Sequence, residues 1–322
     1  MSFLLIGGSG NVGSHIAKEL AEQGETSIIF DVAPPNKILL GDAASKVKFV
    51  RGDIVNLAEI ISTIKENNVT RIIQTASILT GECEKRPFVA MKVNIEGTVN
   101  VLEACRFTDV ERLVYTSSSS VYGKGGLEDA KITEDFPRNP ESIYGVTKLA
   151  GEIFGQTYVQ KYGLQLIVLR LRLVYGPGQR TGISVITDEL IGKTLRGQQA
   201  ALPYDPTLKL TITYVKDSAH AHVLAAKAPK PKHLFFNINS GITTIGEMVD
   251  TVKAIIPSAD VKLGQGMQTT TKFPMQEHYA KQSGIFSISL AKAELGYEPR
   301  YGVKEGVKDL IEYEKTLLVH KG

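Results

Sequence analysis

The 322-residue chain has no tryptophan and only two cysteines, Cys83 and Cys105. Two thiols are too few for a disulfide framework, and neither has Cys or His neighbours at zinc-like spacing, so we expect reduced thiols and no metal. No apolar run reaches the roughly 18 residues that a membrane helix needs, and the N-terminus lacks the basic start of a signal peptide. We therefore expect a cytoplasmic protein with no membrane partner.

The chain also lacks an excess of one charge. Its net charge is +3, and residues of both signs are interspersed along the sequence. This pattern gives no basic stripe for nucleic acid, so we expect a small-molecule substrate and no nucleic-acid partner. A composition with 43% hydrophobic and 22% charged residues is ordinary for a soluble globular enzyme.

The first 31 residues have the order of a dinucleotide site. A short apolar strand at 3–6 leads into a glycine-rich turn at 7–13 and a helix, and a second strand at 27–30 ends at Asp31. Glycines let the backbone approach a pyrophosphate, a helix N-terminus offers free N–H groups, and a carboxylate after the second strand can hold a ribose diol. We interpret the segment as a nucleotide site rather than a plain glycine-rich turn. The candidate cofactor residues here are Gly7, Gly10, Asn11, Val12, Gly13 and Asp31.

Tyr144 and Lys148 form a second candidate site. They are four residues apart in an expected helix, so the phenol and the ammonium share a face, where a cation favours the phenolate. Upstream, an apolar strand at 112–116 runs into the hydroxyl cluster 116–120, which would lie at the carboxyl edge of a parallel sheet. The alternatives are a solvated Tyr/Lys pair and a serine-rich loop that caps the strand.

The glycine spacing and the Tyr-x-x-x-Lys pair resemble the short-chain dehydrogenase/reductase superfamily. The resemblance extends over nearly the whole chain and narrows to the extended branch, the NAD-dependent epimerase/dehydratase group. Its marks are Gly52-Asp53-Ile54, Ala76-Ser77, Val93 to Thr98, Val174 to Gly178, Tyr214 to Asp217 and Glu294 to Pro299. The resemblance implies Ser118, Tyr144 and Lys148 as catalytic residues. It adds as cofactor-binding residues Asp53, Ile54, Thr75, Ala76, Ser77, Asn94 and Thr116, together with Tyr144 and Lys148.

By this resemblance the cofactor is NAD and the chemistry is hydride transfer. Tyr144 would exchange a proton with a substrate oxygen, Ser118 would donate a hydrogen bond to it, and Lys148 would hold the ribose and tune Tyr144. Two departures from the family pattern concern the substrate. Ser119 and Ser120 replace an acidic pair of the dehydratases, which disfavours dehydration, and Leu173 and Leu210 replace an Asn and an Arg that anchor sugar nucleotides.

Arg172 is either paired with a buried acid or available to an anionic substrate, and Ser118, Ser119 and Arg172 are the candidate substrate residues. We therefore expect an NAD-dependent oxidoreductase that interconverts a secondary alcohol and a ketone in a small polar, carbohydrate-derived substrate. The alternatives are a nucleotide-sugar 4-epimerase and a non-catalytic, NAD-binding regulatory protein. The sequence does not choose the substrate.

Alternating strand and helix patterns predict an α/β fold: a doubly wound parallel sheet of the Rossmann type, with helices on both faces and a smaller C-terminal substrate lobe. We assign 1–175 and a returning segment, 211–239, to the NAD-binding domain, and 176–210 and 240–322 to the lobe. By resemblance, a homodimer should form through the helix that carries Tyr144. The expected strands are 3–6, 27–30, 47–50, 71–75, 112–116, 166–172 and 234–237, and the expected helices are 11–23, 56–67, 87–107, 142–162 and 182–197.

Overall fold

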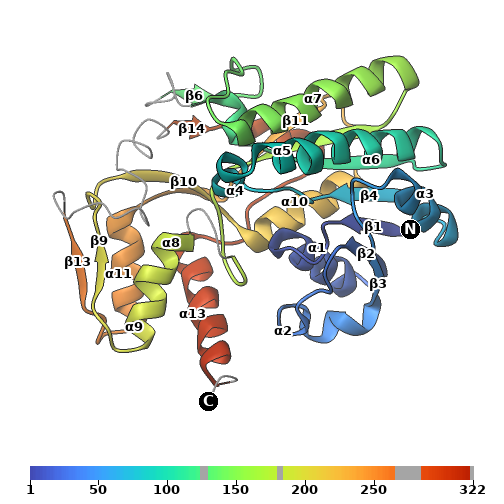
Figure 1. Cartoon of the computed structure of the whole chain (residues 1–322). Helices are drawn as coiled ribbons and strands as arrows, with labels where there is room; N and C mark the ends of the chain where they lie inside the picture. Colours follow the sequence, from blue (N-terminus) through green and yellow to red (C-terminus); the bar gives the residue numbers. More distant parts are fainter. Residues whose placement is uncertain (124–129, 180–183, 265–283, 320–322) are drawn as a thin grey trace.

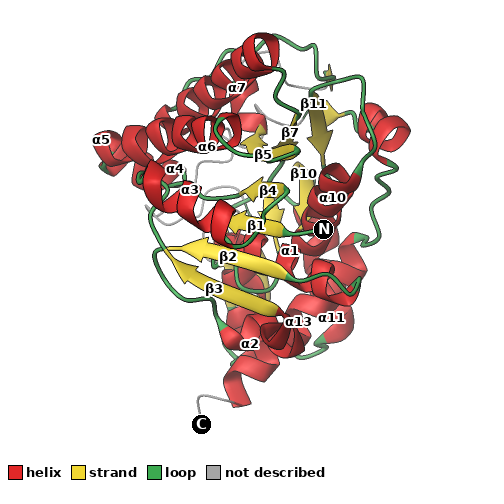
Figure 2. Cartoon of the chain, turned by 90° about the vertical axis from the view of Figure 1, so that its right-hand side faces the viewer, coloured by secondary structure: helices red, strands yellow, loops and turns green. Residues whose placement is uncertain are grey.

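A seven-stranded parallel sheet forms the centre of the molecule (Figures 1 and 2). The computed structural model describes residues 1–123, 130–179, 184–264 and 284–319. The strand order is β11-β7-β5-β4-β1-β2-β3, and each of the seven corresponds to an expected strand. Their bounds are β1 Phe3–Ile6, β2 Ser27–Asp31, β3 Val47–Arg51, β4 Arg71–Gln74, β5 Arg112–Ser118, β7 Leu166–Leu171 and β11 Phe235–Ile238.

The central strands are apolar because both faces of the sheet are covered. Every residue of β1 and of β7 is buried, as strands enclosed between two helical layers require. In Figure 2, α3 (Leu57–Glu66), α6 (Gly97–Arg106) and α7 (Ile143–Tyr162) cover one face, and α1 (Asn11–Glu22) and α10 (Val215–Lys227) cover the other. The expected Rossmann fold class is thereby confirmed.

Helical hydrogen bonding differs from the expectation in the segment 87–107. The run is divided into α5 (Pro87–Ala90), a π-helical stretch η2 (Met91–Glu96) and α6. A π turn adds one residue to the repeat and is frequent at functional sites. Here the π-helical stretch contains the candidate residue Asn94, whose side chain contacts Thr147 of α7.

A smaller lobe, at the lower left of Figure 1, contains β9, β13, α8, α9 and α11, all of which follow Gly176 in the chain. Its three-stranded sheet has the order β12-β10-β8, and α11 (Ile245–Ile255) and α13 (Val303–Val319) pack together beside it. Within the expected returning segment, α10 and β11 join the main domain, whereas β10 lies in the small sheet. The domain boundaries therefore stay a prediction. The small strands are β8 Val174–Tyr175, β9 Ala200–Leu202, β10 Lys209–Tyr214, β12 Gly241–Thr244 and β13 Val261–Leu263, with β6 Lys131–Ile132 and β14 Ile285–Phe286 forming a separate pair.

Short helices complete the lobe and the edges of the main domain. Part of the expected helix 182–197 falls outside the described residues. Its described part is α8 (Ser184–Thr187), the π-helical η4 (Asp188–Gly192) and α9 (Lys193–Leu195). The remaining elements are α2 Lys37–Leu40, η1 Gly41–Lys46, α4 Thr80–Lys85, η3 Ser119–Tyr122 and η5 Ala291–Leu295.

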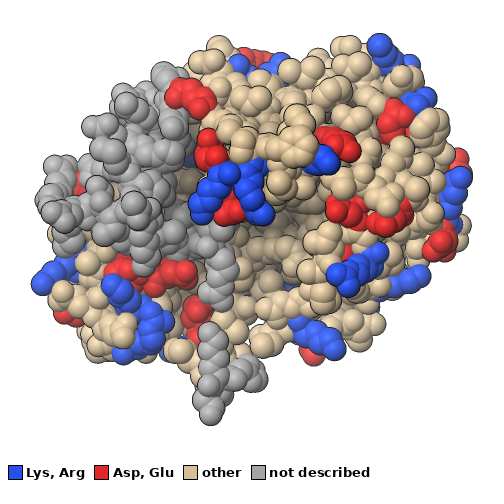
Figure 3. Space-filling model, viewed as in Figure 1, with Lys and Arg blue, Asp and Glu red and all other residues tan. Residues whose placement is uncertain are grey.

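The topology places a ligand site at the carboxyl ends of the central strands. From β1 the chain adds β2 and β3 on one side and then returns to add β4 and β5 on the other, so strand order reverses beside β1. Ligands bind at such a switch point. The surface view in Figure 3 shows Lys and Arg side chains interspersed with Asp and Glu. Among the described residues, no helix is long and apolar enough to cross a bilayer.

Candidate functional site

The glycine-rich turn between β1 and α1 leaves backbone groups open to a ligand. Gly7 has φ of +83°, and a Cβ there would lie 2.3 Å from the backbone nitrogen of Ala76, so only glycine fits. Gly10 is the N-cap of α1 and supplies no side-chain cap, while the first helical bond runs from Ser14 N to Gly10 O. The N–H groups of the first turn therefore lack intrahelical partners and can hold a pyrophosphate.

Asn11, the first residue of α1, and Asp31, the last residue of β2, lie beside this turn. The Asn11 amide nitrogen donates to Gln179 Oε1 at 2.8 Å, whereas its buried Oδ1 accepts no hydrogen bond. Val12 is half-buried in the same first turn of α1, and Gly13 is buried. The Asp31 carboxylate accepts hydrogen bonds from Ser9 N at 3.1 Å and Ala33 N at 3.4 Å, which hold it at the end of β2. These features fit a dinucleotide: the unpartnered Asn11 Oδ1, the uncapped N-terminus of α1 and the Asp31 carboxylate at the end of β2.

The other predicted cofactor residues line the neighbouring strand ends. Thr75 and Ala76 follow β4 and donate backbone hydrogen bonds to Ile6 O, so β4 and β1 end side by side. After β3, Asp53 is exposed and Ile54 is buried against Gly97 of α6. These residues surround the same edge of the sheet as Gly7.

Ser118, Tyr144 and Lys148 meet at the carboxyl end of β5. Lys148 Nζ donates to the backbone oxygen of Thr116 at 2.9 Å and lies 5.7 Å from the centroid of the Tyr144 ring. Ser118 Oγ accepts from Ser120 N at 3.1 Å, which fixes its direction. Helix α7 approaches β5 closely because Gly151 has no side chain; a Cβ there would lie 2.4 Å from Tyr115 Oη.

Burial dominates the electrostatics of this group. It lowers the pKa of Lys148 to about 7 and raises the pKa of Tyr144 to about 12. Interactions with the hydroxyls of Ser118 and Ser77 act against the rise at Tyr144. Near neutral pH the phenol is protonated, whereas the lysine exchanges readily between ammonium and amine. The Tyr144 phenol can donate its proton to a substrate oxygen. A cation beside the phenol would favour the phenolate, and therefore the transfer of a proton from the substrate to Tyr144.

Asn94 and Thr116 connect this group to its surroundings. The Asn94 amide accepts from Ile78 N at 2.8 Å and donates to Thr147 Oγ1 at 3.0 Å, so it ties the loop after β4, including Ser77, to α7. Thr116 Oγ1 lies 2.8 Å from Nε2 of the buried His222 on α10. The sequence does not indicate His222, because no local pattern relates it to a strand residue 106 positions away.

The candidate substrate residues Ser119 and Arg172 are both buried. Ser119 is buried in η3 directly after Ser118. Arg172 follows β7, is 4% exposed and stacks on Phe286 with its Cζ 5.1 Å from the ring centroid. Leu210 is 1% exposed inside the core of the small lobe, and Leu173 packs against that core with φ of +29°. Neither leucine presents a polar group to a ligand.

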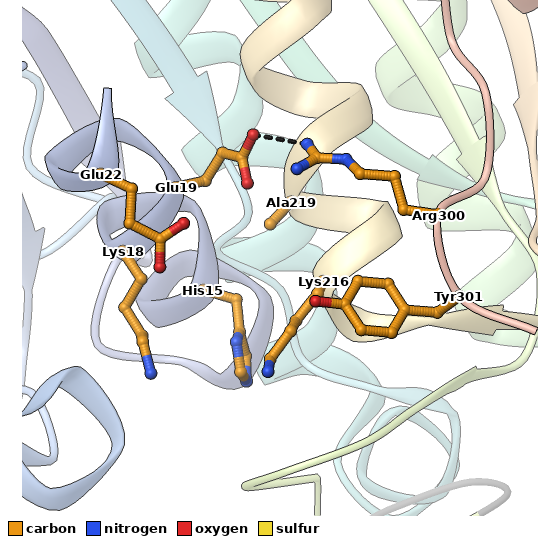
Figure 4. A pocket seen from close by; sticks show the side chains of 8 residues that line it. All are labelled: His15, Lys18, Glu19, Glu22, Lys216, Ala219, Arg300 and Tyr301. Atoms are coloured by element: carbon orange, nitrogen blue, oxygen red, sulfur yellow. Dashed lines mark hydrogen bonds and ion pairs between the residues drawn. The ribbon is translucent and has the colours of Figure 1, made fainter. Parts of the chain in front are cut away.

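A surface cavity of about 100 Å³ lies elsewhere, between α1 and α10 (Figure 4). The Glu19–Arg300 pair, 2.6 Å apart, crosses it. His15 lies in the wall of the cavity, and its Nε2 is 3.1 Å from the backbone oxygen of Pro177. This hydrogen bond connects α1 to the segment that leads into the lobe. None of the candidate residues Ser118, Tyr144 and Lys148 lines this cavity, so we do not place the substrate there. The described residues hold no group of three or more potential metal ligands.

Comparison with known proteins identifies the family. The model of the NAD dependent epimerase/dehydratase family matches residues 3–239, which is most of the chain. The chain belongs to this family. Membership confirms the predicted enzyme class, an NAD-dependent epimerase/dehydrogenase of the extended short-chain type, and confirms NAD as the cofactor.

Relatives of full length differ in what they are named for. A putative UDP-glucose 4-epimerase of Methanocaldococcus jannaschii is 29% identical over 319 residues, 97% of this chain and 98% of the relative. A decarboxylating sterol-4-alpha-carboxylate 3-dehydrogenase of Candida albicans is 27% identical, covering 97% of both chains. The solved UDP-glucose 4-epimerase of Thermotoga maritima, in complex with UDP-glucose, superimposes with a TM-score of 0.82 at 25% identity, covering 99% of this chain and 100% of that one.

Proposed function

We propose that this chain is an NAD-dependent oxidoreductase that interconverts a secondary alcohol and a ketone in a small polar, carbohydrate-derived substrate. The observation that carries the proposal is the convergence of Ser118, Tyr144 and Lys148 at the carboxyl end of β5. Bound NAD supplies the hydride acceptor or donor. Tyr144 exchanges the proton with the substrate oxygen, Ser118 donates a hydrogen bond to that oxygen, and Lys148 supplies positive charge.

The surroundings of the substrate position favour a ligand without a nucleotide. Leu210 is buried within the lobe core and Leu173 is aliphatic, so neither can anchor a diphosphate. Each charge-assisted hydrogen bond that is missing weakens a complex by about tenfold to a hundredfold. Ser119 and Ser120 supply no acid for a departing hydroxide, which supports oxidation rather than dehydration. A complete catalytic group also argues against a purely regulatory NAD-binding protein.

A nucleotide-sugar 4-epimerase is the second candidate. The UDP-glucose epimerases among the relatives favour it. An epimerase oxidises and re-reduces its substrate, so it shows no net redox change. The sterol dehydrogenase, which is about as similar in sequence to this chain, is by its name an enzyme of net oxidation, so it supports the first candidate.

The test is a panel of polyols, sugar acids and UDP-sugars, read by the absorbance of reduced nicotinamide. We expect NADH to accumulate with a polyol or a sugar acid, and no saturable binding of UDP-glucose at millimolar concentration. For a sugar acid, Arg172→Leu should raise KM far more than for its neutral analogue. Micromolar binding of a UDP-sugar, or epimerisation without NADH release, would instead support the second candidate.

A further inference from the structure

Helix α7 carries a third ionisable residue on its catalytic face. Glu152 follows Lys148 by four residues, as Lys148 follows Tyr144, and it is fully buried. Its Oε1 accepts from Ser117 Oγ at 2.7 Å. Ser117 precedes the catalytic Ser118 on β5, so this bond ties the catalytic helix to the strand that carries the catalytic hydroxyl.

Arg170 of β7 holds the same carboxylate from the other side. Its Nε and Nη2 donate to the two oxygens of Glu152 at 2.9 and 2.8 Å. Its Nη1 donates to Tyr122 Oη at 2.7 Å and to the backbone oxygen of Glu134 at 2.8 Å. The guanidinium therefore joins α7 to η3, the turn that follows Ser118.

This buried pair is poorly explained by stability alone. Removing two charges from water carries a penalty that often equals or exceeds their attraction, and apolar replacements are commonly as stable. The partners of this pair, however, are the elements on either side of the catalytic group. We propose that Glu152 and Arg170 are positioning residues. Their ion pair holds Ser118 against α7, and the Glu152 carboxylate, whose field Arg170 offsets, sets the charge of Lys148.

The groups around Lys148 support the proposal that Glu152 influences the charge of Lys148. Cys83 of α4, Tyr115 of β5, and Tyr144 and Glu152 of α7 face or perturb it. Burial lowers its pKa to about 7, while Cys83 and Glu152 act to raise it. Burial also raises the pKa of Cys83, so that thiol stays neutral. Among these groups, Glu152 is the carboxylate, and it is held by two hydrogen bonds from Arg170.

The two arginines that contact Glu152 must act in the opposite sense. Arg170 and the partly exposed Arg138, whose Nη1 is 3.4 Å from Glu152 Oε2, both offset the field of the carboxylate. Loss of Glu152 charge should lower the pKa of Lys148, and loss of either arginine should raise it. If Glu152 and the arginines served packing alone, their loss would not shift the Lys148 pKa in opposite directions.

The experiment is a pH titration of Lys148 in the full chain labelled with 13C at lysine Cε. The Lys148 signal is assigned by its loss in Lys148→Met. We expect Glu152→Gln to lower the Lys148 pKa by about one unit, and Arg138→Gln and Arg170→Met to raise it by a few tenths of a unit or more. Arg112→Met, which removes a buried guanidinium bonded to backbone oxygens of the α10 end, is the matched control and should leave it unchanged.

Unfolding curves accompany each variant. If Arg170→Met does not fold, Arg138→Gln alone tests the expected rise in the Lys148 pKa, because Arg138 lies at the surface with its side chain 33% exposed. An unchanged Lys148 pKa in Glu152→Gln, or shifts of the same sign in Glu152→Gln and Arg138→Gln, would overturn the proposal. The inference rests on the proposed function only in taking Lys148 as the catalytic lysine. Since the titration needs no substrate, failure of the substrate panel does not alter its outcome.

Discussion

Replacing Lys148 with methionine should stabilise the fold near neutral pH while it removes catalysis. Lys148 is 3% exposed, and burial lowers its pKa from 10.5 to about 7. In the unfolded chain the same amine keeps its ordinary pKa and binds more protons than the folded chain between about pH 7 and pH 10.5. Stability linked to this group therefore rises with pH across that window and is constant below it.

The magnitude follows from the shift. At 1.36 kcal/mol per pKa unit, the buried amine destabilises the folded state by about 4 kcal/mol at pH 7. Methionine removes this penalty but also loses the hydrogen bond to Thr116 O, which contributes about 1 kcal/mol. We expect Lys148→Met to raise the free energy of unfolding by about 2–3 kcal/mol at pH 7, and the gain to fall to near zero by about pH 10.

Urea unfolding of both proteins at several pH values between about 7 and 10 tests this expectation. Lys161→Met is the matched control, because Lys161 lies exposed on the same helix and its loss should change stability little at any pH. A Lys148→Met protein less stable than the wild type at pH 7, or a difference between the two that does not vary with pH, would refute the reasoning.

Three further predictions concern catalysis, cofactor choice and assembly. Tyr144→Phe should lower turnover by about 10²- to 10⁴-fold with NAD affinity close to normal, because the lost hydroxyl transfers a proton; substantial residual turnover would contradict that role. NAD should be preferred over NADP, since Asp31 would repel a 2′-phosphate, and Asp31→Ala with Val32→Arg should erode that preference in steady-state kinetics; equal use by the wild type would argue otherwise. Ile153 and Phe154 are 52% and 41% exposed on α7, so light scattering should show a homodimer that Ile153→Glu weakens; a monomeric wild type would exclude this interface.

The sequence by itself determined the dinucleotide half of the molecule. Strand, glycine turn, helix and acid are adjacent in the chain, and backbone conformation and helix periodicity are local properties. The same locality placed Tyr144 and Lys148 on one helical face. It could also have indicated Glu152, because the four-residue spacing continues for one more turn.

Only the tertiary structure decided what surrounds those residues. The pairing of Glu152 with Arg170, and of Thr116 with His222, joins segments 18 and 106 residues apart, and no periodicity relates them. The same holds for Leu210, whose burial in the lobe core follows from strand β10 pairing with β8 and β12. The helix α10, at 215–227, is not among the helices predicted from the sequence, although together with α1 it covers one face of the sheet. Local sequence features thus predicted the dinucleotide turn and the shared face of Tyr144 and Lys148, while long-range packing determined which side chains surround them.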